Sequence, residues 1–249
     1  AGASTLRFLT WRCRTWRQNA ALMHMRQLFR HHSSFARLSA AAAVLALSAP
    51  MAWAGGLDSL AQFVKGTRSG KAAFTQVVTA PAKDGQAPRA KTQSGTFEFQ
   101  RPGKFRFVYS KPFEQTLVAD GKTLWLHDVD LNQVTARQQE QVLGATPAAI
   151  VAAAPDLKAL EKDFTLTEEP DSGGQQWVKA VPKSRDGQLQ SIRVGLKPAA
   201  GGAELGTLDI LDSFGQRSVL TFSNFEVNAA MPASHFQFTP PKGADVLRN

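Results

Sequence analysis

Cysteine, tyrosine and long apolar runs are all scarce in this sequence. Its 249 residues include one cysteine, Cys13, and one tyrosine, Tyr109. A single thiol can form neither an internal disulfide nor a thiolate metal centre. The motifs H-E-x-x-H and G-x-S-x-G, which mark zinc proteases and serine hydrolases, do not occur either. We therefore expect a protein that is not an enzyme and that binds neither a metal nor a cofactor.

Two segments imitate ligand-binding loops but lack the residues that such loops need. Residues 66–72 are one residue short of the phosphate loop G-x-x-x-x-G-K-[ST], and Ala72 replaces the hydroxyl that would bind magnesium. Residues 128–132 begin like a calcium loop. There, however, Gln133 replaces the glycine of the turn and Gln139 replaces the bidentate acid. We interpret the second segment as a polar hairpin turn.

The first 54 residues contain the three parts of a secretory signal peptide. A basic stretch beginning at Met25 precedes an Ala-rich apolar run over 38–47, and Ala52-Trp53-Ala54 follows as an A-x-A cleavage site. The run is too short to cross a bilayer comfortably, which favours a cleaved signal over a membrane anchor. We interpret residues 1–24 as an extension upstream of the natural start, 25–54 as the signal peptide and 55–249 as one exported domain.

The basic character of the chain comes mostly from this first segment. All charged residues within residues 1–54 are arginines, seven of them, so the formal net charge of +9 falls to about +2 without them. A nearly neutral domain has no electrostatic reason to bind nucleic acid. We expect no nucleic-acid partner and a monomeric product with no lipid anchor, because Cys13 leaves with the signal segment.

Most of residues 55–249 has the period-2 pattern of β-strands. Helical spacing occurs at 57–64, and Thr146 and Pro147 are suited to begin a second helix over 146–154, with a further helical turn at 156–160. Asp-Gly pairs at 84–85, 120–121 and 186–187 indicate hairpin turns. We predict strands at 73–79, 92–100, 104–110, 116–119, 123–127, 133–137, 164–168, 176–181, 190–196, 204–211, 218–224 and 236–238. A meander this long must curl, and helices inserted near its middle favour an open, incomplete antiparallel barrel with a helical lid.

Two adjacent predicted strands place five aromatic rings on one face. Pro102-Gly103 forms the turn between them, and Arg101 adds a permanent cation at the rim of this apolar wall. The rings are those of Phe97, Phe99, Phe105, Phe107 and Tyr109. Such a wall suits an apolar ligand, although rings on one face of a strand also form ordinary core. Periodicity alone leaves both interpretations open.

Several blocks of the sequence resemble the LolA family of periplasmic outer-membrane lipoprotein carriers. They are Phe74-Thr75-Gln76, Gly95-Thr96-Phe97, Arg101-Pro102 with Phe105, 117–125 with its D-G-K-T-L-W core, Thr146-Pro147, and 236–243 with F-x-F-x-P-P-x-G. The resemblance spans nearly all of 57–249. It implies an open barrel of about eleven strands, capped by helices, that shields lipoprotein acyl chains in the periplasm.

The resemblance also implies partners and roles for particular residues. The cargo would be acylated lipoproteins, received from an inner-membrane ABC transporter and passed to an outer-membrane acceptor. Arg101 would hydrogen-bond to the lid in its closed form. The cavity wall would comprise Phe97, Phe99, Phe105, Phe107, Tyr109, Leu124 and Leu126, and the lid helix would include Pro147, Ile150, Val151 and Ala152. Ala148 and Ala149 replace bulkier side chains of better-known members, which affects lid packing.

Three other functions are compatible with the pattern. One is a periplasmic carrier of another lipid or fatty acid on the same half-barrel. The second is a lipid hydrolase that would need a serine to meet a histidine such as His235. The third is a barrel with a solid core that acts as an interaction module.

Overall fold

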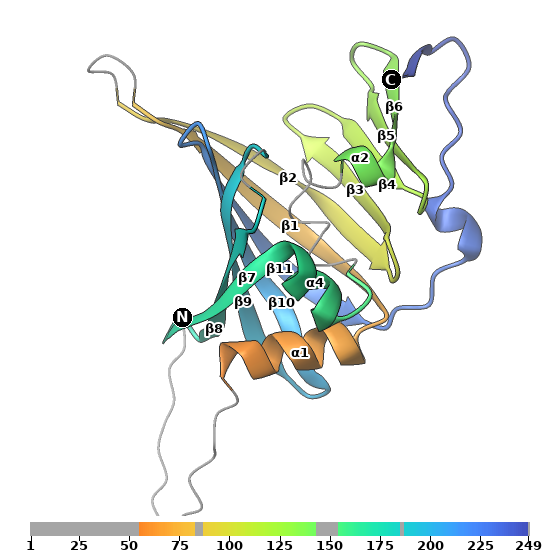
Figure 1. The fold of residues 1–249 in the computed structure, drawn as a ribbon. Helices are drawn as coiled ribbons and strands as arrows, with labels where there is room; N and C mark the ends of the chain where they lie inside the picture. Colours follow the sequence, from red (N-terminus) through yellow and green to blue (C-terminus); the bar gives the residue numbers. More distant parts are fainter. Residues whose placement is uncertain (1–54, 83–86, 143–153, 185–186, 249) are drawn as a thin grey trace, which may run out of the picture. The chain divides into compact units, whose positions relative to one another are not determined.

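A computed structural model describes residues 55–82, 87–142, 154–184 and 187–248 (Figure 1). The elements in chain order are α1 (Gly56–Gly66), β1 (Ser69–Ala80), β2 (Arg89–Gln100), β3 (Lys104–Lys111), β4 (Gln115–Ala119), β5 (Thr123–Asp128), β6 (Gln133–Gln138), α2 (Gln139–Val142), α4 (Leu157–Asp163), β7 (Phe164–Ser172), β8 (Gln175–Pro182), β9 (Leu189–Ala199), β10 (Gly202–Asp212), β11 (Arg217–Val227), the 3₁₀ helix η2 (Ala233–Phe236) and β12 (Asp245–Arg248). Within these residues, no helix is long and apolar enough to span a membrane.

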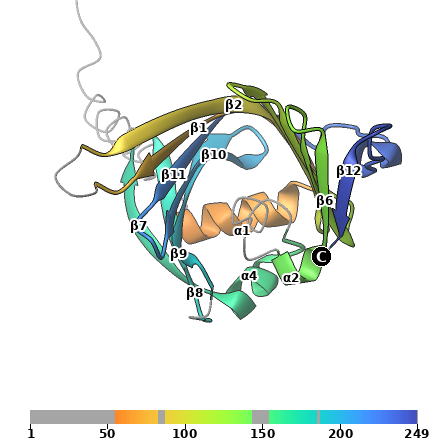
Figure 2. The same cartoon turned by 90° about the horizontal axis from the view of Figure 1, so that it is seen from above.

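The strands form one open, strongly curved sheet. Across the described residues it has twelve strands in the order β12-β6-β5-β4-β3-β2-β1-β11-β10-β9-β8-β7. Figure 2 shows this sheet curving around α1, with β6 and β7 on opposite sides of the helix. The prediction of a mainly β, open antiparallel sheet is confirmed, with one strand more than the expected eleven.

The twelfth strand and the end of the chain depart from the prediction. β12 pairs in parallel with β6, from Asp245 opposite Gln133 to Arg248 opposite Ala136. Its four residues are too short to show a period, and the pairing brings together segments far apart in sequence. The strand predicted at 236–238 is wrong, because Ala233–Phe236 forms a 3₁₀ helix.

This C-terminal segment packs on the convex face of β2–β6. The Phe236 ring is fully buried, and the Phe238 ring lies 5.6 Å from that of Trp125. His235 Nε2 lies 2.6 Å from Glu98 Oε2. Since Glu98 and Trp125 alternate with inward-facing residues along their strands, the segment supplies a second apolar layer outside the sheet.

Helix α1 packs against the concave face. Leu60, Phe63 and Val64, spaced three and one residues apart, are buried, and Ser59 Oγ donates a hydrogen bond to Gln176 Oε1 of β8. The predicted helix at 57–64 is therefore confirmed and buries its apolar side against the sheet.

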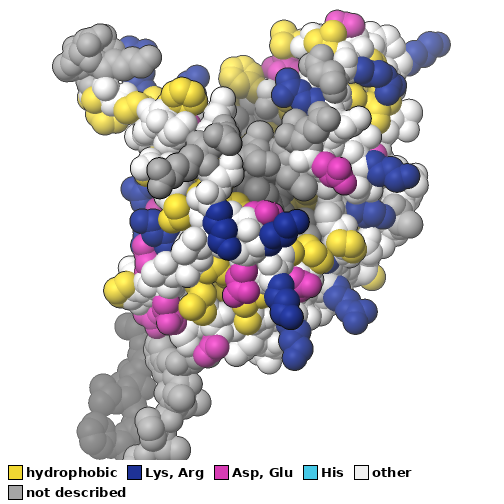
Figure 3. Space-filling view, in the orientation of Figure 1, with side chains coloured by type: hydrophobic (Ala, Val, Ile, Leu, Met, Phe, Trp, Pro, Cys, Tyr) yellow, Lys and Arg dark blue, Asp and Glu magenta, His cyan; other side chains and the backbone are white. Residues whose placement is uncertain are grey.

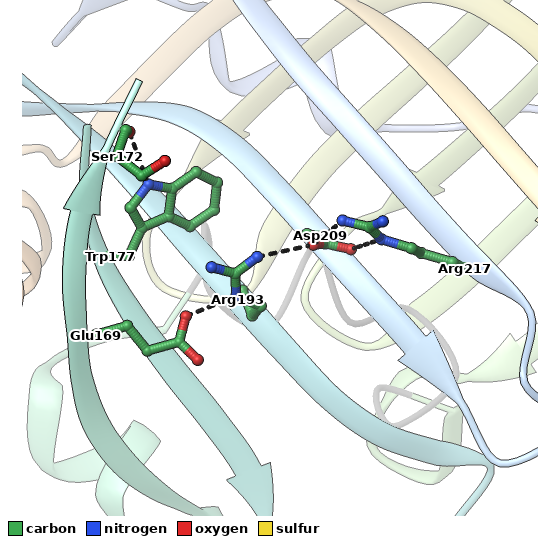
Figure 4. A network of polar contacts seen from close by, with 6 residues as sticks. All are labelled: Glu169, Ser172, Trp177, Arg193, Asp209 and Arg217. Carbon is green, nitrogen blue, oxygen red and sulfur yellow. Dashed lines mark hydrogen bonds and ion pairs between the residues drawn. The ribbon is translucent and has the colours of Figure 1, made fainter. Parts of the chain in front are cut away.

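The convex face of β7–β11 carries a polar network instead of an apolar layer (Figure 4). Asp209 accepts hydrogen bonds from Arg217 Nε at 2.8 Å and Nη2 at 2.7 Å, and from Arg193 Nη1 at 3.3 Å. Hydrogen bonding to Arg217, the largest influence, lowers the pKa of Asp209. Arg193 also binds Glu169 at 2.6 Å and lies over the Trp177 ring at 4.8 Å. These contacts connect neighbouring strands on the solvent-facing side of the sheet.

Candidate functional site

The predicted ring wall exists and is tightly packed. Register pairs Phe97 with Phe107 and Phe99 with Phe105 across β2 and β3, so all four rings share the concave face. Each is at most 2% exposed. The Phe97 and Phe107 ring centroids lie 4.3 Å apart in a stacked arrangement. The prediction of one aromatic face is confirmed. In this structure the four phenylalanines form core, packed against one another and against α1.

The rings added by other elements explain why this part of the face is full. Phe63 of α1 lies 6.2 Å from Phe99, and Phe74 of β1 lies 5.5 Å from Phe107 in an edge-to-face contact. Sequence reasoning missed both partners. The apolar side of the predicted helix and the alternation of Phe74 with Gln76 were the signals available for finding them.

The same face becomes half-exposed towards the end of β5. Leu126 lies opposite Leu117 of β4, which in turn lies opposite Phe107. Leu126 is 40% exposed, whereas Leu124, two residues earlier, is buried. Of the seven predicted wall residues, the structure thus brings six into or beside the core and leaves Leu126 accessible to a ligand.

A row of polar groups crosses this half-exposed region. Tyr109 Oη donates to Gln76 Oε1 at 3.1 Å, and Gln76 Nε2 donates to Ser218 Oγ at 2.6 Å. Burial raises the pKa of Tyr109 to about 12. Tyr109 reaches β1 across Gly95 of β2, where a Cβ atom would lie 1.9 Å from the Val108 carbonyl oxygen. Side-chain identity alone gave no sign of this row.

Arg101 ties two segments together beneath the rings. Its Nε donates to the Thr67 carbonyl oxygen at 2.7 Å, and its Nη1 donates to the Ala154 carbonyl oxygen. The guanidinium carbon lies 5.1 Å from the Phe63 ring centroid and 5.2 Å from that of Phe99. Burial lowers the pKa of Arg101 to about 10. Thr67 follows α1, and Ala154 is the last residue of the predicted lid segment, so Arg101 connects α1 with the end of that segment.

A pocket of about 760 Å³ opens beside Arg101. Its lining comes from α1, the β2–β3 turn and the start of α4: Ala61, Val64, Lys65, Arg68, Arg101, Pro102, Pro155, Asp156, Leu157 and Lys158. Apolar side chains and cations share its surface, with Asp156 as the one acid of this lining. The sequence pattern gave no indication of this pocket.

Several sequence-based expectations concern other sites. The proposed lid residues Pro147, Ile150, Val151 and Ala152 lie outside the described residues. The phosphate-loop imitation runs from the end of α1 into β1, the reverse of the strand–loop–helix order of a true phosphate loop. In the described part of the chain, no three His, Cys, Asp or Glu side chains gather as a metal site. His235 binds Glu98 on the convex face, away from the ring wall.

Comparison with known proteins extends over most of the chain. The family model "Outer membrane lipoprotein carrier protein LolA" matches residues 65–239. The outer-membrane lipoprotein carrier protein of Albidiferax ferrireducens is 68% identical over 204 residues, covering 82% of this chain and 96% of that protein. The protein of the same name from Methylibium petroleiphilum is 52% identical, covering 82% and 95%, and that of Neisseria meningitidis is 38% identical, covering 89% and 100%. Among solved structures, a LolA superfamily protein from Nitrosomonas europaea matches with a TM-score of 0.43 and 12% identity, covering 75% of this chain and 99% of that one.

Proposed function

The chain belongs to the LolA family of outer-membrane lipoprotein carrier proteins, and from this premise we propose how it carries its cargo. It receives acylated lipoproteins from an inner-membrane ABC transporter, shields their acyl chains while crossing the periplasm, and passes them to an outer-membrane acceptor. It acts by binding, without catalysis. The observation that carries this proposal is the open, curved sheet whose concave face carries an apolar strip from Phe107 through Leu117 to Leu126.

The energetics favour partial burial of the cargo. Each buried methylene stabilises an acyl chain by about 0.8 kcal/mol, so complete burial of two or three chains would prevent release. The half-exposed strip of Leu117, Leu126 and Tyr109 offers a starting surface. Deeper entry requires the packed rings to separate. The free energy that this separation costs would offset part of the binding energy and keep transfer possible.

Arg101 is the proposed lock of the empty state, which means that its hydrogen bonds stabilise the closed form without cargo. Its two bonds to the Thr67 and Ala154 carbonyls hold α1 and the end of the lid segment together. Cargo that enters between them would break these bonds. The loaded state is then less favourable by their loss, and release to the acceptor becomes easier.

A matched pair of substitutions tests the binding surface. Leu126 on the concave face and Val129 in the β5–β6 turn are 40% and 41% exposed, so neither change leaves a fully buried charge. Leu126→Glu should abolish lipoprotein release from spheroplasts, because a carboxylate among acyl chains has no compensating partner. Val129→Glu should leave release unchanged. Equal release by both variants would show that acyl chains do not contact Leu126.

The proposed maturation has its own test. Cleavage after Ala54 would give a periplasmic protein that begins at Gly55. N-terminal sequencing of the protein from a periplasmic extract measures this directly. A product that begins at Met25, or one retained quantitatively with membranes, would contradict the proposal.

A further inference from the structure

The pocket beside Arg101 contains more positive charge than its surroundings balance. Lys65 lies in the last turn of α1, Arg68 two residues beyond the helix, and Lys158 in the first turn of α4. All three are exposed, and with Arg101 they give the lining four cations. No salt bridge joins any of the four to an acid within the described ranges.

The lining holds one acid, Asp156, which can balance the charge of at most one of the four cations. Asp156 Oδ1 accepts a hydrogen bond from the Ala159 backbone nitrogen at 2.8 Å and caps α4. Figure 3 shows several Lys and Arg side chains on the face where α1 and α4 lie, interspersed with acidic ones.

Arg101 itself has an unused donor. Nε and Nη1 are bonded to carbonyl oxygens, but Nη2 is buried and has no hydrogen-bond partner among the residues that the structure describes. A buried, unpaired donor of a charged group is costly, and native structures seldom leave one without a partner. Burial also lowers the pKa of Arg101 to about 10. Arg101 lines the pocket, so a small shift of its side chain would let an oxygen-rich anion there accept from Nη2.

The other half of the lining is apolar. Ala61, Val64, Pro102, Pro155 and Leu157 complete the pocket, and its volume of about 760 Å³ falls within the range of small-molecule sites. Guanidinium groups recognise phosphate through several parallel hydrogen bonds, and lysines contribute as point charges. A free inorganic ion would leave the apolar half of the lining unused.

We propose that this pocket binds the phosphate of an anionic amphiphile, such as a phospholipid headgroup, with the first part of its acyl tails against the apolar residues. The site is distinct from the concave strip at Leu126, and the proposal does not depend on lipoprotein carriage. It assigns Lys65, Arg68 and Lys158 to ligand binding.

Calorimetric titration of the purified protein tests this assignment. The probe is dihexanoyl phosphatidylglycerol below its critical micelle concentration, compared with dihexanoyl phosphatidylcholine and with inorganic phosphate. The anionic lipid should bind most tightly. The choline cation of phosphatidylcholine offsets the charge of its phosphate and is repelled by the cations of the lining, and inorganic phosphate has no acyl tails to contact the apolar residues. Replacing Lys65, Arg68 and Lys158 together by Gln should weaken its binding by roughly tenfold, which corresponds to about 1.4 kcal/mol.

Lys162→Gln provides the matched control. Lys162 lies one turn after Lys158 on α4, is exposed and does not line the pocket. Its replacement should leave the affinity unchanged, and circular dichroism should show the same fold for all variants. Equal weakening by Lys162→Gln, or unchanged affinity of the triple variant, would overturn the proposal. Inorganic phosphate or phosphatidylcholine binding as tightly as phosphatidylglycerol would overturn the choice of ligand.

Discussion

Replacing Phe107 by Glu distinguishes two interpretations of the ring wall, a packed core and the lining of a cavity. The Phe107 side chain is 2% exposed and lies between Phe97 and Phe74, at centroid distances of 4.3 and 5.5 Å. In a cavity wall, a carboxylate at this position would stop acyl binding and leave the fold intact. In the packed arrangement that the structure shows, the same change removes a ring from the core and buries an acid.

The expected loss of stability follows from two contributions. Truncating a buried Phe costs about 3–5 kcal/mol, and a buried carboxyl with no partner adds about 1–3 kcal/mol. A domain of this size has a free energy of unfolding of about 5–15 kcal/mol. Phe107→Glu should therefore lose most of its stability at neutral pH, with a large fall in its urea midpoint.

The pH dependence identifies the buried charge as the cause. Burial raises the pKa of an introduced Glu above its unfolded value of about 4.3. Stability is then greatest below that value and declines as pH rises through the folded-state pKa, by up to about 1.4 kcal/mol per pH unit. Phe107→Gln supplies a control of similar shape without the charge, and its stability relative to the unmodified protein should not change over this range.

Urea unfolding followed by circular dichroism between pH 4 and 8 measures these effects. A Phe107→Glu protein with the unmodified urea midpoint at pH 8 would refute the reasoning. It would mean that water reaches residue 107 and that the rings line an open cavity in the empty protein.

Two further predictions concern polar groups at the site. Arg101→Leu should lower the free energy of unfolding by roughly 2–4 kcal/mol, because two carbonyls lose charged donors. This variant should still load cargo but transfer it more slowly. Arg101→Lys should restore little of the function, because lysine lacks the planar, several-donor guanidinium group. Transfer to the acceptor as fast as in the unmodified protein would exclude the proposed lock. Tyr109, the sole tyrosine, has a pKa raised to about 12, so its contribution to stability is complete below the unfolded value of about 10 and declines as pH rises to 12. Absorbance titration of the folded protein should show ionisation well above pH 10, and a midpoint near 10 without unfolding would contradict its burial.

The sequence pattern predicted most strands because their alternation is local. The segments predicted at 92–100 and 104–110 lie within β2 and β3, and the Pro102-Gly103 turn joins them as expected. The Asp120-Gly121 turn also joins β4 to β5, with Gly121 at a φ of 101°. The turns predicted at 84–85 and 186–187 fall at least partly outside the described residues.

What the pattern could not predict depends on contacts between distant segments. Phe236 alternates with Phe238 like a strand, yet it forms a 3₁₀ helix because the convex face of β2–β6 offers its ring a buried place. Placing five rings on one face was correct, but whether they enclose space depended on Phe63 and Phe74 from other elements. Arg101 could be placed near the rim from its alternation, whereas its carbonyl partners depended on the resemblance to a family.

The central position of β1 has a consequence for the order of folding. β1 pairs with β2 on one side and with β11 on the other, where Thr75 lies opposite Thr221. The strands β2–β6 and β7–β11 are each hairpin meanders that can assemble from local contacts. Their union must wait until almost the whole chain is present, and closing so long a loop is slow. The two meanders can thus form separately, but the continuous sheet is completed only after β11 is available to pair with β1.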